Sequence, residues 1–143
     1  MKKKIMISAC LLLATIAVQA TGVLPQGRWL IEKVIVEKNT DENIKTTEYN
    51  SAADVKSYIS CPEELVISAK NIVLRYPDGR EETAEYTLEG DRLTIFAATA
   101  MQLYHYSVNN GVLTLTAVHN YLNNLPTGYT EQISENWTII LKK

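Results

Sequence analysis

The chain has 143 residues, with 14 basic and 16 acidic side chains and a formal net charge of −2. The first twenty residues hold three of the lysines, so in the remaining 123 residues 11 basic side chains face 16 acidic ones. A chain of this length is expected to form one domain, and an acidic surface without basic clusters is poorly suited to phosphate backbones or anionic membranes. Nucleic acid is therefore not an expected partner.

The N-terminus has the pattern of a cleaved secretory signal peptide. Lys2, Lys3 and Lys4 precede an apolar run from residue 5 to 18, and the short side chains Val18 and Ala20 fit a signal peptidase. The apolar run is shorter than the roughly 20 residues of a membrane span. We expect residues 1–20 to be removed and residues 21–143 to form a single periplasmic or secreted domain, with no integral membrane span.

The chain has two cysteines, but only one lies outside the predicted leader, so no disulfide is expected within the mature chain. Ile7-Ser8-Ala9-Cys10 matches a bacterial lipobox, but it lies too close to the lysines for a normal apolar leader, so lipid anchoring at Cys10 is not expected. Cys10 leaves with the leader, and Cys61 remains as a single thiol. A lone cysteine of this kind is usually a small buried apolar residue.

A repeat of twenty residues predicts a β-meander. Residues 86–95 match residues 106–115, and each copy carries a turn dipeptide, Gly90-Asp91 or Asn110-Gly111, between alternating apolar runs. The dipeptide Lys70-Asn71 occupies the corresponding position twenty residues before Gly90-Asp91. Such dipeptides accept the positive φ of two-residue hairpin turns, so each period is expected to hold two antiparallel strands.

Extending this pattern outward predicts an all-β fold. We expect strands at residues 29–37, 43–49, 64–69, 72–77, 80–89, 92–98, 102–109, 112–119 and 131–142. About eight such strands with short connections favour a closed antiparallel up-and-down barrel, because closure removes the exposed edges; a two-sheet β-sandwich is the alternative. Ser51-x-x-Asp54 and the proline of Cys61-Pro62 predict one short helix over residues 51–60.

The start of the first strand resembles that of lipocalins. Gly27-Arg28-Trp29 has the form of the G-x-W signature, and residues 86–95 and 106–115 are similar to the later strands of bacterial lipocalin-like domains, which are short, exported proteins. The resemblance implies a barrel that carries a small apolar or amphipathic molecule. It also implies that Trp29 lies at the closed end beneath a basic residue of the last strand, a role that falls to Lys142.

Strand alternation predicts which side chains point into the barrel. The inward set is Ile72, Leu74, Tyr76, Ala84, Tyr86, Leu88, Leu93, Ile95, Tyr104, Tyr106, Val108, Leu113, Leu115, Trp137, Ile139 and Leu141. An eight-stranded barrel is either filled by such side chains or holds one small ligand. If it holds one, the candidate ligand-binding residues are Tyr76, Tyr86, Tyr104, Tyr106, Glu135 and Trp137, since tyrosines on an apolar wall suit an amphipathic guest.

Two charged residues interrupt the apolar alternation. Glu135 shares parity with Trp137, and Lys33 shares parity with Trp29, so both would face inward in regular strands. Either they meet a partner or a ligand there, or a β-bulge turns them toward water.

Two functional hypotheses follow. The first is an exported lipocalin-like protein that binds a small apolar or amphipathic ligand in its lumen. The second is a solid barrel that binds a protein partner through the 120–130 loop, where Tyr121, Leu122, Leu125 and Tyr129 form an apolar cluster. No nucleophile with a base and an orienting acid is recognisable, and His105 and His119 have no neighbouring ligands, so neither an enzyme, a metal site nor a cofactor is expected.

Overall fold

The computed structural model describes residues 24–57, 60–98 and 101–143. These residues form almost nothing but β-structure. The strands are β1 (Gly27–Asn39), β2 (Ile44–Tyr49), β3 (Glu64–Ile67), β4 (Asn71–Arg75), β5 (Glu81–Glu89), β6 (Arg92–Phe96), β7 (Met101–Asn109), β8 (Val112–Asn124) and β9 (Thr130–Lys142). The predicted leader and the lipobox at Cys10 lie outside the described residues.

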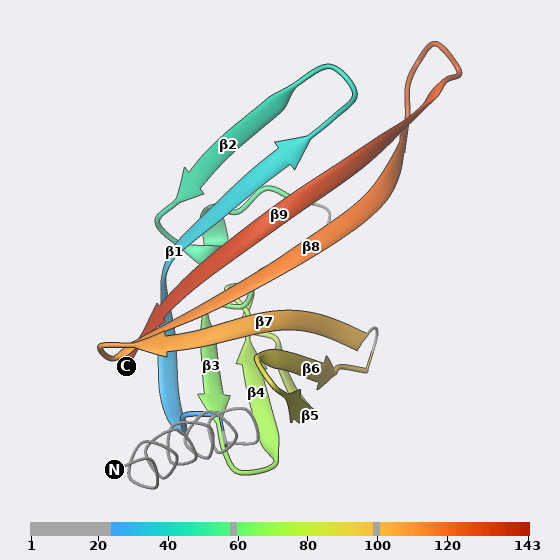
Figure 1. Ribbon diagram of the computed structural model, residues 1–143. Coiled ribbons are helices and arrows are strands. Elements are labelled where there is room, and N and C mark those ends of the chain that lie inside the picture. The colour runs from blue at the N-terminus through green and yellow to red at the C-terminus, as the bar shows by residue number, and fades with distance from the viewer. Residues whose placement is uncertain (1–23, 58–59, 99–100) are drawn as a thin grey trace, which may run out of the picture.

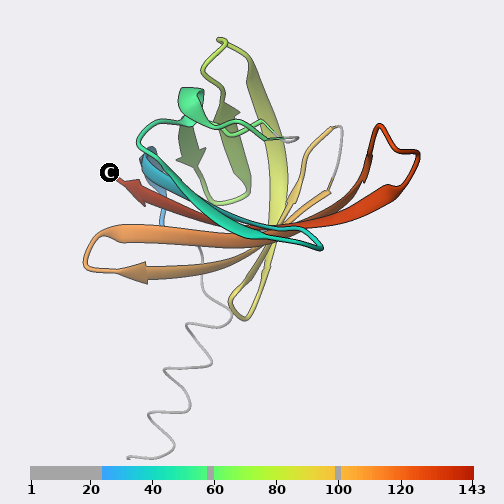
Figure 2. The same cartoon turned by 90° about the horizontal axis from the view of Figure 1, so that it is seen from above.

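The strands form a closed antiparallel barrel of eight strands with one strand added. The sheet order is β2-β1-β3-β4-β5-β6-β7-β8-β9, and β1 also pairs with β9, which closes the ring (Figures 1 and 2). The predicted up-and-down barrel is confirmed, and the sandwich alternative does not apply. Strand β2 pairs with the second half of β1 and stands outside the ring.

A β-bulge in β1 decides which of its side chains face the core. Ile31 pairs with Leu141 and Lys33 with Ile140, so Glu32 is an extra residue between them. Beyond the bulge the parity changes, and Val34 is fully buried while Lys33 lies within 3.7 Å of Glu48 on β2. The alternative of a bulge is therefore correct for Lys33.

The core contains nearly all of the predicted inward set. Ile72, Leu74, Leu93, Leu113 and Leu141 are at most 1% exposed, and the half-buried tyrosines at 86, 104 and 106 pack against this core. Val108 was expected to point inward but is exposed. Val108 lies one pair from the β7–β8 turn, opposite the fully buried Leu113, so at this end of the hairpin only the β8 side chain reaches the core.

The hairpin turns agree with the repeat. Asn110 and Gly111 both have positive φ (51° and 76°), as a type I′ turn requires, and Gly90 has φ 62°. The β3–β4 turn lies one residue earlier than expected, because Ser68 N–H donates to the Asn71 carbonyl at 2.9 Å.

Two elements differ in length from the prediction. The helix expected over 51–60 is a single 3-10 turn, Ala52–Asp54, because Ser51 Oγ donates to the Asp54 carboxylate instead of capping a backbone N–H and Val55 is already extended. The loop expected at 120–130 is mostly strand, since β8 and β9 pair as far as Asn124 and Thr130. These strands form a long projecting hairpin, which we call the β8–β9 arm (Figure 1).

Trp29 lies at the barrel end where the chain enters β1. It is 2% exposed, and its Nε1 donates to the Pro25 carbonyl at 3.0 Å. The basic residue over its ring is Lys143, whose Nζ is 5.3 Å from the ring centroid, and not Lys142. Lys142 points outward and pairs with Glu32 at 3.0 Å, because neighbouring residues of a strand face opposite sides. No helix in the described part of the chain is long and apolar enough to span a membrane.

Candidate functional site

The connection between β2 and β3, called the 50–63 segment and described at residues 50–57 and 60–63, lies at the opposite end of the barrel from Trp29. Ala52 and Cys61 of this segment are buried in the core cluster. Burial raises the pKa of the Cys61 thiol to about 12, so the thiol stays protonated at neutral pH. The lone cysteine is thus a small buried residue, as expected, and the segment is held to the barrel by apolar contacts.

Beneath this segment lies Glu135 of β9, which is only 3% exposed. Ser57 Oγ donates to Oε1 at 2.6 Å, Trp137 Nε1 donates to the same oxygen at 3.0 Å, and Tyr121 OH donates to Oε2 at 2.9 Å. Glu135 therefore faces inward, as its parity predicts, and the bulge alternative is wrong for this residue. Its acceptors are engaged by the protein's own donors.

These hydrogen bonds determine the ionisation of the site. Burial acts to raise the pKa of Glu135, but the bonds from Ser57, Trp137 and Tyr121, aided by the charge of Lys38, lower it below the usual glutamate range. The pKa of Tyr121 rises to about 12, through burial and then through its bond to Glu135. Burial lowers the pKa of His119, which meets the Trp137 ring edge-on at 5.6 Å between centroids. At neutral pH the cluster therefore holds one carboxylate and a neutral imidazole.

The predicted tyrosines do not converge on one point. Tyr86 OH donates to the Ser68 carbonyl at 2.8 Å at the end of the barrel where β3 turns into β4. Tyr76 is buried under the Arg80 guanidinium, 4.6 Å from the ring centroid. Tyr104 OH donates to Gln102 Oε1 at 3.0 Å, and burial raises the pKa of Tyr104. Tyr106 is half-buried beside the core, and its backbone N–H donates to the Asp91 carbonyl.

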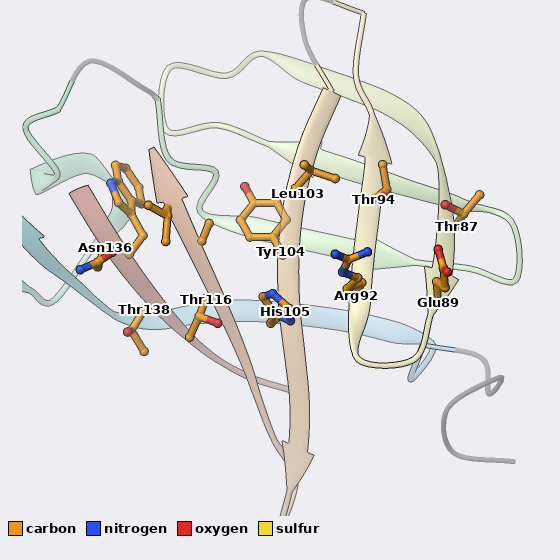
Figure 3. A pocket seen from close by; sticks show the side chains of 13 residues that line it. Thr87, Glu89, Arg92, Thr94, Leu103, Tyr104, His105, Thr116, Asn136 and Thr138 are labelled. Atoms are coloured by element: carbon orange, nitrogen blue, oxygen red, sulfur yellow. The ribbon is translucent and has the colours of Figure 1, made fainter. Parts of the chain in front are cut away.

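The barrel wall opens between β7 and β8. These strands pair with each other only from His105–Thr116 to Asn109–Val112, and the ladder between them does not continue toward the start of β7 and the end of β8. Figure 1 shows the two strands converging at their turn and diverging toward the other end. A groove of about 530 Å³ lies along this divergence and runs across the outer face of β5 to β9 (Figure 3).

The groove combines inward and outward side chains. Its lining is Thr87, Glu89, Arg92, Thr94, Leu103, Tyr104, His105, Thr116, Ala117, Val118, Asn136, Trp137 and Thr138. Tyr104, Ala117 and Trp137 belong to the barrel interior and form the inner wall of the groove, where Ala117 and Trp137 are buried and Tyr104 is half-buried. Leu103 and Val118 flank them on the outer face and are 60% and 61% exposed. The groove thus has an apolar part at the β7–β8 opening and a polar part over β5 and β6.

Of the predicted site residues, Tyr104 and Trp137 line this groove together, and Trp137 connects it to Glu135 through a hydrogen bond. Tyr76, Tyr86 and Tyr106 do not line it. Sequence reasoning missed Leu103, Val118 and Arg92, because all three fall on the outward parity of their strands. The available signal was the apolar outward residue at 103 and 118, where a solvated barrel face would carry a polar one.

Comparison with protein-family models, curated proteins and solved structures finds no match. No three His, Cys, Asp or Glu side chains within residues 24–57, 60–98 and 101–143 are placed to hold a metal ion together. The groove and the chemistry of its lining are therefore the features from which a function can be inferred.

Proposed function

We propose that this protein is an exported, lipocalin-like binding protein that holds a small amphipathic molecule in the groove between β7 and β8. The observation that carries the proposal is the separation of β7 from β8, along which the exposed Leu103 and Val118 border a groove whose inner wall includes Tyr104 and Trp137. A volume of about 530 Å³ lies within the range of small-molecule sites, which are mostly apolar with a few polar groups.

Two further features support the lipocalin-like part of the proposal. The barrel is an eight-stranded meander that begins with Gly27-Arg28-Trp29, and a basic residue, Lys143, lies over the tryptophan ring. In this proposal the ligand sits at the wall opening and not deep in the lumen, because the centre of the barrel is occupied by fully buried side chains such as Ile72, Leu74 and Leu113. Export is part of the same proposal and is supported by the sequence of residues 1–20.

Charge at the groove edge tests this function. Leu103→Asp places a carboxylate against the apolar part of the groove. Because Leu103 is 60% exposed, the variant is expected to fold. We expect amphiphile affinity, measured by isothermal titration calorimetry, to fall by about tenfold or more, because burying a charge costs more than the lost contact. Ile44→Asp on β2 is the matched control, since Ile44 is equally apolar and exposed but lies on a strand that contributes no residue to the groove. Equal binding by both variants would rule the groove out.

A protein-interaction module is the second candidate, favoured by the β8–β9 arm. Leu122 and Tyr129 on the arm are 69% and 76% exposed, and the ladder between β7 and β8 ends at the His105–Thr116 pair, so the edge of β8 beyond it does not pair with β7. Such an edge can accept an extended segment of a partner. A photo-crosslinking residue at position 122, compared with one at position 44, is expected to give one defined adduct in the exporting host. Background labelling at both positions would contradict this candidate.

A further inference from the structure

The polar part of the groove contains an arginine whose charge is not balanced. The chain has four arginines. Arg28 and Arg75 both pair with Glu64, Arg75 also pairs with Glu81, and Arg80 pairs with Asp78. Arg92, which lines the groove, has no ion pair with any described residue.

Arg92 is the one arginine of the described residues without an ion pair, although these residues hold 16 acidic side chains and only 11 basic ones. The two register neighbours of Arg92 do not neutralise it. Glu89 on β5 is its pairing partner but lies beyond ion-pair distance, and His105 on β7 turns its Nδ1 to Asp91 at 3.2 Å.

Arg92 lies on the strand next to the apolar part of the groove. Arg92 is on β6, next to the β7 strand that carries Leu103 and Tyr104, whereas Glu89 is one strand further away on β5. Figure 3 shows Arg92 between Glu89 and His105, with Thr94 on the same strand. Adjacent strands are about 4.8 Å apart, so a molecule with an apolar body over β7 and β8 places its head group near β6.

We propose that the ligand of this groove is an anionic amphiphile whose acidic head group, such as a carboxylate, is bound by Arg92. The inference rests on the proposed ligand-binding function and specifies the ligand class. The guanidinium supplies paired N–H donors that match a carboxylate, and the hydroxyl of Thr94 is a further donor nearby. Leu103 and Val118, the two exposed apolar side chains of the lining, contact the apolar body. Glu89 repels the head group from the far side and limits how far it can move along the groove.

The test compares ligands of one chain length with three kinds of head group. Decanoate, 1-decanol and decylamine, each below its micelle concentration, are titrated into the protein at neutral pH and low salt. We expect decanoate to bind about tenfold more tightly than 1-decanol, and decylamine to bind most weakly, since a charged hydrogen bond adds to the shared apolar contact. Added salt is expected to weaken the binding of decanoate and leave that of 1-decanol almost unchanged.

Three variants assign the effect to the head-group contact. Arg92→Gln is expected to reduce the affinity for decanoate to that for 1-decanol and to leave 1-decanol binding as in the wild type. Glu89→Gln is expected to strengthen decanoate binding a few-fold, by about the amount of one screened surface charge. Lys45→Gln on β2 makes the same charge change as Arg92→Gln far from the groove, and it is expected to leave all three affinities unchanged.

Different outcomes separate a groove that binds amphiphiles without an anionic head group from a groove that binds no amphiphile. If decanoate and 1-decanol bind equally well and Arg92→Gln changes neither, while Leu103→Asp still weakens both, the groove binds amphiphiles but not through an anion. Weaker decanoate binding in Glu89→Gln would likewise overturn the anionic head group. If none of the three probes binds in a manner that Leu103→Asp abolishes, both proposals are wrong.

Discussion

Glu135 is the centre of the side-chain hydrogen bonds at the end of the barrel near the 50–63 segment. Its two oxygens accept hydrogen bonds from Ser57, Tyr121 and Trp137, which belong to three different parts of the chain. These three donors occupy most of the acceptor sites of the carboxylate. Its role is to attach the 50–63 segment to β8 and β9 and to fix the indole that lines the groove.

Glu135→Gln tests this role, because it keeps the shape of the side chain and removes the charge. The amide nitrogen is a donor placed among donors, so we expect the free energy of unfolding to fall by about 1.5 to 3 kcal/mol at pH 7. Urea denaturation measures the loss. Glu131→Gln on the same strand is the control and is expected to change stability by less than about 0.5 kcal/mol.

The same pair of proteins gives a pH dependence with a definite sign. The pKa of Glu135 is lower in the folded state than in the unfolded chain, so its contribution is fully present above the usual glutamate pKa of about 4.3. The contribution is lost as the pH falls through the lowered folded value. The stability difference between wild type and Glu135→Gln is therefore expected to be constant near pH 7 and to shrink in acid. A difference that grows below pH 4 would contradict the ionised, hydrogen-bonded carboxylate.

At the scale of elements, the sequence predicted the strands of the meander well and the irregular segments poorly. The hairpins from β3 to β8 follow from turn dipeptides and alternation, which are local properties. The bulge at Glu32 has no local signal, since it arises where β1 pairs with both β3 and β9. The 51–60 segment has a helical pattern, but contacts with the barrel, such as Ser57 to Glu135, favour an extended course. The groove depends on the divergence of β7 and β8, which no single strand encodes.

Gly111 in the β7–β8 turn has a backbone conformation that a residue with a Cβ adopts only at a cost. Its φ is 76°, and a Cβ there would meet no atom within 4 Å, so any cost of Gly111→Ala comes from the backbone conformation alone. We expect a loss of about 1 to 2 kcal/mol, the cost of the left-handed region for a residue with a Cβ. Thermal denaturation of this variant beside Ser107→Ala on the same hairpin isolates the turn. Equal stability of the two variants would mean that the β7–β8 turn does not keep its type I′ geometry in solution.

For the whole molecule, the defining contact is the pairing of β1 with β9, which joins the beginning and end of the described chain. Leu30 to Asn39 pair with Ser134 to Lys142, and Val34 and Ile139 face each other across this seam and are buried. Antiparallel ladders run around the ring, but β1 leaves β3 beyond Leu30 and β7 leaves β8 beyond the His105–Thr116 pair. Of these two separations, the one between β7 and β8 is bordered by the groove, which suits it to a ligand.

Because the seam is held by hydrogen bonds and packing, the fold is expected to tolerate a new order of elements. Gly27 and Lys143 are close, since a Cβ on Gly27 would lie 3.2 Å from Lys143 Cε. A linker of about eight residues from Lys143 to residue 21 can then join the ends, with new termini opened between Asp78 and Gly79 in the exposed β4–β5 turn. We expect this circular permutant to unfold in one cooperative transition, within about 3 kcal/mol of the parent, because only loop-closure entropy changes. Circular dichroism and tryptophan fluorescence measure the transition, and Trp29 and Trp137 report from opposite ends of the barrel. Non-coincident transitions would show that the β1–β9 seam depends on the original chain order and is not a self-sufficient closure.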